Sequence, residues 1–352
     1  MIALIGIPSE PPLALAHAAL QALGVPVVML NQREFDHWGL ELQVAGSSLA
    51  GRLRIRDRQI PLSGIRGIYA RPSDVHTLPE LMNEPPNSPR RRRCQLLHDL
   101  ILRWMELTDA RVVNRPAAMA SNSSKPYQAQ LIAAAGFDVP PTLVTDDGQE
   151  VLAFQREYGR VIYKSISGAR SIVTELRDTD AERLAQLKGC PVQFQACIPG
   201  LDVRVHTIGD AVFAASAASD AVDYRYAGRQ GSDLELRPYA LDGVLGDRCL
   251  SLARSLGLDF AGIDLKITPD GRAVCFEVNP CPAYSFYEEH TGQPIAAALA
   301  RFLAGRNWPA PTWNMLPVGR RATKACEWDS PGSRLARQPI VRKEDPRNSQ
   351  TG

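Results

Sequence analysis

Oxygen-bearing side chains gather in one short stretch of the sequence, on both sides of a predicted turn. Asp264 precedes Pro269-Asp270-Gly271, and Glu277 and Asn279 follow it. The flanking segments alternate apolar and polar residues, so the two carboxylates and the amide are expected on one face of a hairpin. This set is too small to enclose Mg²⁺, but it suits an ion that keeps waters and takes further ligands from nucleotide phosphates. A polar surface hairpin without a metal is the alternative.

A lysine further upstream is placed to meet a phosphate. Lys164 follows the apolar run Val161-Ile162-Tyr163 and precedes the small-residue segment Ser165–Ser171, which contains Arg170. A lysine at the end of a strand supplies a point charge, and the N–H groups of a small-residue loop can close over a phosphate beside it. The segment has a single glycine, which makes this signal weaker than a glycine-rich loop.

A second lysine stands at the predicted start of a helix. Ser124 and Pro126 around Lys125 fit the cap and first turn of a helix that runs to Ala135 and ends at Gly136. By itself Lys125 is more simply a solvated surface residue than a phosphate ligand.

The segment from Val192 to Ile198 is extended and apolar, and Pro199-Gly200 ends it. Its backbone groups could hydrogen-bond the edge of an adenine. On the next predicted strand, alternation puts Asp202, Arg204 and His206 on one face. Asp202 and Arg204 could instead simply pair with each other, and His206 is interpreted as structural.

These segments need elements to position them, and the chain divides into three parts. Residues 1–115 alternate apolar runs with helical stretches, which predicts a small α/β domain with a mostly parallel sheet. Residues 116–303 mix helices with hairpins and carry nearly all of the candidate chemistry. Residues 304–352 lack apolar periodicity and are predicted to be a disordered tail, in which Trp308 could dock locally.

Composition fits an ordinary enzyme. The 352 residues, 45% of them hydrophobic, suffice for two domains, and the net charge of +2 does not favour a nucleic-acid partner. Seven cysteines without a CxxC pair indicate a reduced, cytoplasmic protein. Neither a signal peptide nor a membrane-spanning run is expected.

Taken in order, these motifs resemble the ATP-grasp enzymes of the RimK-like type. The resemblance covers Asn122 to about Leu303. It rests on Ser124-Lys125, Gly136, Pro140-Pro141-Thr142, Lys164, Gln195 to Ile198, Gly200-x-Asp202-x-Arg204-Val205, Asp223-x-Arg225, Gly262-x-Asp264, Glu277-Val278-Asn279-Pro280 and Thr291-Gly292 opening the last helix.

The resemblance implies a pre-ATP-grasp domain followed by a two-subdomain ATP-grasp fold. The two α+β subdomains are expected at about 116–190 and 191–303, with ATP between them. The implied ATP ligands are Lys125 and Lys164 at the phosphates, Gln195, Ala196, Cys197 and Ile198 at the adenine, and Asp202 at the ribose. Asp264, Glu277 and Asn279 would hold magnesium, as two Mg²⁺ ions or with Mn²⁺ as a substitute.

The implied reaction is ATP-dependent ligation. A carboxylate accepts the γ-phosphoryl group, and an amine, hydroxyl or thiol then attacks the acylphosphate. Arg204 and Arg225 are the candidate catalytic residues, because a guanidinium fork matches both the acylphosphate and a substrate carboxylate. A non-catalytic ATP-binding scaffold and a small-molecule kinase remain as alternatives. The oligomeric state is left open between dimer and tetramer.

Three positions depart from the family pattern, namely Ala196 in place of a glutamate, the glycine-poor loop after Lys164, and Cys281, which is interpreted as a small buried thiol. The first domain, with Arg71 after Ile68-Tyr69-Ala70, resembles that of peptide-modifying ligases. An acidic peptide could therefore be the substrate. Arg71 could help it dock or be structural, and Arg90 to Arg93 are interpreted first as a solvated face.

Overall fold

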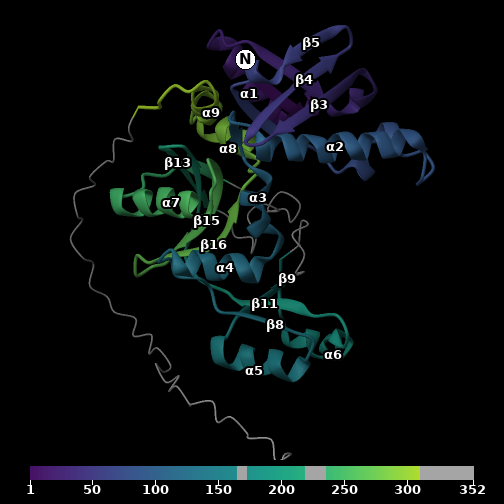
Figure 1. Ribbon diagram of the computed structural model, residues 1–352. Coiled ribbons are helices and arrows are strands. Elements are labelled where there is room, and N and C mark those ends of the chain that lie inside the picture. The colour runs from purple at the N-terminus through teal and green to yellow at the C-terminus, as the bar shows by residue number, and fades with distance from the viewer. Residues whose placement is uncertain (165–172, 219–234, 310–352) are drawn as a thin grey trace, which may run out of the picture. The chain divides into compact units, whose positions relative to one another are not determined.

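The computed structural model describes residues 1–164, 173–218 and 235–309, all within one compact unit (Figure 1). The segment after Lys164 with Arg170, the cluster around Arg225, and residues 310–352 of the predicted tail lie outside the described residues.

The N-terminal part has a parallel sheet with a helix on each face, as predicted. Its strands lie in the order β2-β1-β6-β7. Alternate residues of β1 enter two different cores, one with α1 and the other with α2, so the sheet is buried on both sides. The elements are β1 Ile2–Gly6, α1 Pro11–Ala22, β2 Val27–Asn31, β6 Gly67–Arg71, α2 Pro89–Leu107 and β7 Arg111–Val113.

A second, antiparallel sheet in this part was not predicted. It is formed by β3 Trp38–Ala45, β4 Ser48–Ile55 and β5 Arg58–Pro61. The signal was present in the sequence, because two alternating segments flank a short turn at Gly46, whose φ is +59°.

The third sheet, in the order β10-β9-β11-β8, is antiparallel. Helices α5 and α6 lie together beside it in Figure 1, and they share a small apolar core with β9 and β11 that includes Val151, Leu184 and Phe194. The elements are β8 Thr142–Thr145, α5 Gly148–Tyr158, β9 Val161–Lys164, β10 Thr174–Glu175, α6 Ala181–Leu184 and β11 Val192–Ala196.

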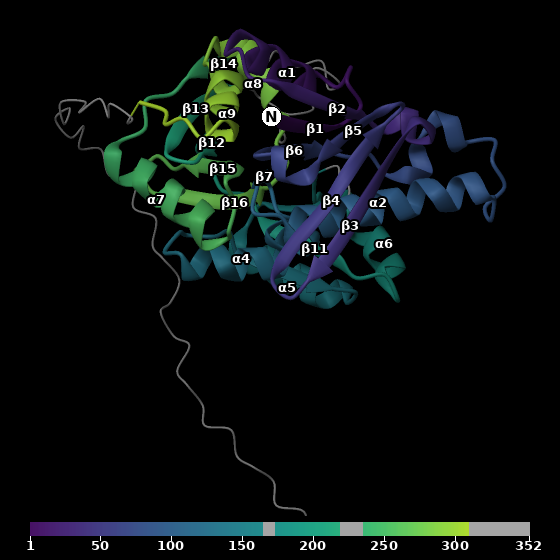
Figure 2. The same ribbon diagram turned by 45° about the horizontal axis from the view of Figure 1, so that its top comes forward.

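The fourth sheet is antiparallel, in the order β14-β13-β12-β15-β16. Helices α4 and α7 pack on one of its faces, as Figure 2 shows, and the residues that alternate with the predicted site residues fill the core between them. The elements are α3 Pro116–Met119, α4 Lys125–Ala134, β12 Leu201–Ile208, β13 Ala211–Ala218, β14 Glu235–Pro238, α7 Gly243–Ser255, β15 Phe260–Ile267, β16 Ala273–Asn279, α8 Tyr284–Thr291 and α9 Ile295–Leu303.

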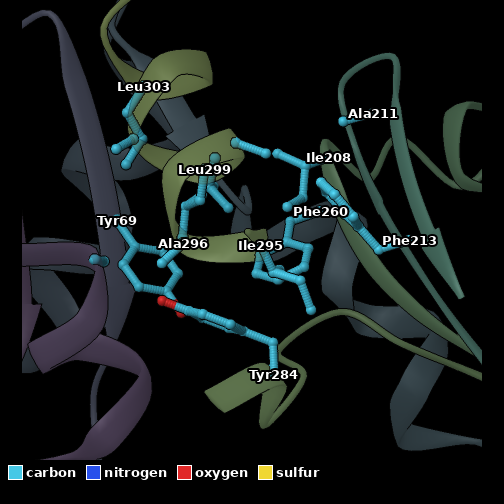
Figure 3. Close-up of a cluster of buried hydrophobic side chains, with 14 of the residues drawn as sticks. Tyr69, Ile208, Ala211, Phe213, Phe260, Tyr284, Ile295, Ala296, Leu299 and Leu303 are labelled. Carbon is cyan, nitrogen blue, oxygen red and sulfur yellow. The ribbon is translucent and has the colours of Figure 1, made fainter. Parts of the chain in front are cut away.

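Helix α9 joins the first and fourth sheets through one core (Figure 3). Ile295 and Leu299 are fully buried and belong to the same apolar cluster as Tyr69 of β6 and Phe260 of β15. Trp308 docks against this cluster, with its ring 5.8 Å from that of Phe213. The boundary predicted near residue 115 remains a prediction, since the core extends across it.

One local prediction was wrong. Thr291-Gly292 ends α8 instead of opening the last helix, because Gly292 takes the left-handed φ of +68° that closes a helix. Ser124 lies at the cap position of α4, but its side chain makes no capping hydrogen bond.

Candidate active site

The hairpin with the predicted metal ligands forms as expected from the sequence. Strands β15 and β16 pair antiparallel, with Asp264 opposite Glu277 and Gly262 opposite Asn279. Directly opposed residues of an antiparallel pair point to the same face, so the two carboxylates share it. The Oδ1 atom of Asn279 accepts a hydrogen bond from the N–H of Cys281 at 2.9 Å, which orients the amide at the end of the strand.

Gln128 holds this hairpin against helix α4. Its amide donates to the carbonyl of Val278 at 2.8 Å and accepts from the N–H of Val278 at 2.9 Å. Val278 lies between Glu277 and Asn279 on β16, which is an edge strand of the sheet. The buried side-chain amide of Gln128 therefore also satisfies backbone N–H and C=O groups that an edge strand leaves without a partner strand. The sequence carried no signal for this contact between residues 150 positions apart.

Asn114 fixes the open end of the hairpin, away from its turn. Its amide nitrogen donates to the carbonyls of Phe260 and Pro280 at 2.6 Å each, and its oxygen accepts from the N–H groups of Asp259 and Phe260. Asn114 thereby joins the start of β15 to the residue that follows β16.

Each carboxylate of the hairpin faces a cation. Nζ of Lys125 lies 3.7 Å from Glu277, and the two side chains are mostly buried. Nη1 of Arg204 donates to Asp264 at 2.6 Å, with only 5% of the arginine side chain exposed. Helix α4, strand β12 and the hairpin thus bring Lys125, Arg204 and both acids to one place.

Lys164 and the predicted adenine segment line one cavity with the hairpin carboxylates. Lys164 is buried, and its Nζ donates to Oε1 of Gln195 at 3.3 Å. The amide nitrogen of Gln195 in turn donates to Thr142 at 3.0 Å. The lining residues are Ile162, Lys164, Val173, Gln195, Ala196, Cys197, Ile198, Asp202, Val203, Asp264, Leu265, Lys266, Phe276 and Glu277.

The adenine segment uses part of its backbone internally. The N–H of Ala196 bonds to the carbonyl of Pro141 at 3.0 Å, and that of Cys197 bonds to the carbonyl of Arg160 at 2.8 Å. The assignment of this segment to the adenine, with Ala196 in place of a glutamate, stays a prediction.

Asp202 and Arg204 each pair across to β15. Asp202 lies 3.3 Å from Nζ of Lys266, and Arg204 bonds Asp264. The sequence analysis weighed a pair between Asp202 and Arg204 but overlooked Lys266. The signal for Lys266 was alternation, because it is two residues after Asp264 and shares its face.

A β-bulge turns Phe276 toward the cavity. The pairing of β15 and β16 shifts between Asp264 and Leu265, so that Glu277 pairs with Asp264 while Cys275 pairs with Leu265. The extra residue is Phe276, which is half-buried at the cavity wall while Cys275 is fully buried in the core. The alternation of apolar and polar residues could not have predicted this orientation of Phe276, because a β-bulge interrupts the alternation.

His206 is a structural residue, as interpreted from the sequence. It is fully buried, 4.9 Å from the ring of Tyr287 and 6.3 Å from that of Phe260 between centroids. Burial lowers the pKa of its imidazole well below the usual value, and the charge of Arg204 adds to the effect.

Arg71 and Cys281 meet at the loop after the hairpin. Arg71 pairs with Glu10 at 2.8 Å and donates to the Sγ of Cys281 and the carbonyl of Pro282. These contacts favour the structural interpretation of Arg71. The residue Cys281 is exposed, but burial around its Sγ raises the pKa of the thiol, so the buried-thiol interpretation holds only in part. It lies in a turn whose backbone continues from Asn279 into α8.

The basic run on α2 is tied to its own domain. Arg90 bonds Asp36 at 2.8 Å, Arg91 bonds the carbonyl of Glu84 at 3.1 Å and Arg93 bonds that of Trp38 at 3.1 Å. Arg92 and Arg93 are exposed, which agrees with the first interpretation, a solvated face, while Arg90 and Arg91 are half-buried in contacts with their own domain. These bonds position α2 against the antiparallel sheet.

The oxygen donors of the hairpin fit magnesium. Within the described residues, no three acidic, histidine or cysteine side chains form a cluster that could enclose a metal. Asp264 and Glu277, with the amide of Asn279, offer hard oxygen ligands on one face and leave the rest of the coordination sphere open. Such a site suits an ion whose other ligands are water and phosphate oxygens.

The family model of the RimK-like ATP-grasp domain matches residues 122–303, the segment that carries every motif of the site. The chain belongs to the RimK-like ATP-grasp family. A probable alpha-L-glutamate ligase of Xanthomonas oryzae is 29% identical over 224 residues, which cover 58% of this chain and 72% of that protein. A ribosomal protein bS6--L-glutamate ligase of Salmonella newport is 26% identical over 57% of this chain and 70% of that protein.

Solved ATP-grasp structures extend the likeness to the N-terminal part. The ATP-grasp ligase PsnB, complexed with a phosphomimetic variant of its minimal precursor, Mg and ADP, aligns with 86% of this chain and 97% of its own. Its TM-score is 0.71 and its identity 26%. The macrocyclase MdnC of Microcystis aeruginosa, bound with precursor peptide MdnA, has the same fold, with a TM-score of 0.71 over 87% of this chain and 99% of its own at 21% identity.

The predicted fold class and enzyme class are confirmed by these findings. This RimK-like ATP-grasp protein is an ATP-dependent carboxylate–amine ligase, and the scaffold and kinase alternatives are not favoured. ATP and Mg²⁺ are supported as its cofactors, while the number of ions and the use of Mn²⁺ stay predictions. None of the helices among residues 1–164, 173–218 and 235–309 has the length and apolar character to cross a membrane.

Proposed function

We propose that this protein activates a carboxylate of a peptide or protein and joins it to an amine. The observation that carries the proposal is the face on which Asp264 and Glu277 lie opposite each other, with Arg204 and Lys125 against them, at the cavity that also contains Lys164. Bound Mg²⁺ would neutralise phosphate charge there. Lys125 and Lys164 would hold the phosphates, while Arg204 and Arg225 would orient the carboxylate toward the γ-phosphorus.

The reaction balances in two steps. A carboxylate oxygen attacks the γ-phosphorus, the bond to the bridging oxygen breaks, and ADP leaves with that oxygen. The amine then attacks the acyl carbon, phosphate leaves with the original carboxylate oxygen, and the amine loses a proton to give an amide. Positioning and charge stabilisation by the side chains supply the catalysis.

A peptide or protein substrate is supported by two relatives. PsnB is described in complex with precursor peptides, and the Salmonella relative is named for adding glutamate to ribosomal protein bS6. We also propose a cytoplasmic location, which the ribosomal protein in the name of the Salmonella relative supports. We also propose that the protein acts as an oligomer, either a dimer or a tetramer.

The experiment is incubation of the protein with ATP, Mg²⁺, hydroxylamine and a synthetic peptide that contains glutamate, aspartate and lysine. We expect a peptide hydroxamate with hydroxylamine. Without it we expect ADP and free phosphate in equal amounts, with a peptide that has lost one water. A peptide that gains a phosphoryl group, with ADP but no free phosphate, would show a kinase and contradict the proposal.

A further inference from the structure

A lysine outside the predicted set lies inside the nucleotide cavity. Lys266 follows Asp264 by two residues on β15 and lines the same cavity. Its Nζ lies 3.3 Å from the carboxylate of Asp202 on the neighbouring strand, and its side chain is only 17% exposed. A lysine that is mostly buried, paired and directed at a ligand cavity has a more specific role than a solvated one.

The strand register places Lys266 along the nucleotide. Asp202 lies opposite Lys266, and Arg204 lies opposite Asp264. Moving from the Asp202–Lys266 pair to the Arg204–Asp264 pair advances two residues, or about 6.7 Å, along the sheet. The first pair is the nearer one to Ile198 in the chain, and the second carries the metal carboxylate.

We expect different parts of the nucleotide at the two ends of this stretch of β12 and β15. The base is expected at Ile198, and a metal ion that Asp264 would hold would neutralise charge at the end of the triphosphate that reacts. The position between them belongs to the ribose and the α-phosphate. Asp202 is the candidate for the ribose, which leaves the α-phosphate for the cation beside it.

We propose that Lys266 binds the α-phosphate of the nucleotide while it remains paired with Asp202. The proposal rests on the proposed function, since it requires ATP in this cavity. An ammonium group has three donors, so one can stay on Asp202 while another reaches a phosphate oxygen. Lys266 would also cancel the repulsion that the carboxylate of Asp202 would otherwise exert on the α-phosphate.

The test compares ligands that differ by one phosphate at a time. Adenosine, AMP and ADP are titrated calorimetrically into the wild type and into Lys266→Met, which keeps the apolar stem of the side chain. We expect AMP and ADP to lose about ten- to a hundredfold in affinity, as for one charge-assisted contact, and adenosine to lose less than about threefold. Lys266→Arg should recover most of the AMP affinity because it retains the charge.

Lys188→Met is the matched control, because Lys188 is exposed and does not line this cavity. It should bind all three ligands as the wild type does. An equal loss for adenosine and AMP in Lys266→Met, or no loss for AMP, would overturn the proposal. A wild type that binds none of the three adenine ligands would instead contradict the proposed function.

Discussion

The guanidinium group of Arg204 lies over Gly262, in the space that a side chain there would fill. A Cβ atom built on Gly262 would be 2.2 Å from Nη2 of Arg204 and 2.6 Å from its Cζ. The Cζ atom of Arg204 lies 5.7 Å from the ring centre of Tyr287, and its Nη1 lies 2.6 Å from Oδ1 of Asp264. The missing side chain at residue 262 is therefore what allows the buried Arg204–Asp264 pair to form.

Gly262→Ala should displace Arg204 and disturb Asp264, the predicted metal ligand. We expect ATP turnover to fall at least about tenfold, and the free energy of unfolding to fall by about 1 to 3 kcal/mol, as for overpacking of a tight site. Phosphate release and urea denaturation measure the two effects. The control is Gly64→Ala, where a Cβ would have no atom within 4 Å. Wild-type turnover in Gly262→Ala would show that this geometry is not needed.

Lys164→Met should weaken ATP far more than adenosine. The stem of the side chain would keep its packing beside Gln195, while one charge-assisted contact to phosphate is lost. We expect a loss of about 1.5 to 3 kcal/mol, roughly ten- to a hundredfold in ATP affinity, by calorimetric titration. Equal losses for ATP and adenosine would mean that Lys164 supports the pocket wall and not the phosphates.

His206 should make the protein less stable in mild acid. The folded state lowers the pKa of the imidazole well below its ordinary value, so below pH 6.5 the unfolded chain binds a proton that the folded chain does not. This contribution is fully present above about pH 6.5 and is lost as the pH falls, by up to about 1.4 kcal/mol per unit.

Urea denaturation between pH 7.5 and pH 5, at about half-unit steps, measures this effect. His206→Gln should flatten the slope of unfolding free energy against pH. His76→Gln, at an exposed histidine, should keep it. An unchanged slope in His206→Gln would refute the assignment.

The site hairpin could be predicted from the sequence because all of its determinants are local. Alternation sets the face of Asp264 and Glu277, and Pro269-Asp270-Gly271 sets the turn. The parallel first sheet followed in the same way from apolar runs separated by helices.

The other parts depend on contacts that no local pattern encodes. Gln128 reaches Val278 and Asn114 reaches Pro280 from more than a hundred residues away, and only the folded chain brings them together. Phe276 faces the cavity because a bulge interrupts the alternation that predicted its neighbours. The antiparallel sheet of β3 to β5, by contrast, could have been predicted from its alternating segments and turn, but it was overlooked.

Helix α4 depends on both kinds of information. Pro126 marked its start, and Lys125 was recognised as a candidate ligand. The distance of 3.7 Å from Lys125 to Glu277 is a tertiary contact, set by the docking of α4 on β16 through Gln128. The assignment of Lys125 to a phosphate stays a prediction.

The central claim is that the face of Asp264 and Glu277 binds nucleotide through magnesium, and Glu277→Ala tests it most directly. A non-hydrolysable ATP analogue is titrated calorimetrically into wild type and variant, with and without Mg²⁺, and Glu289→Ala serves as the control at an exposed glutamate of α8. We expect Mg²⁺ to strengthen binding to the wild type and the control. In Glu277→Ala, which should fold normally but lose ATP turnover, that gain should disappear. An equal gain from Mg²⁺ in Glu277→Ala would contradict the account.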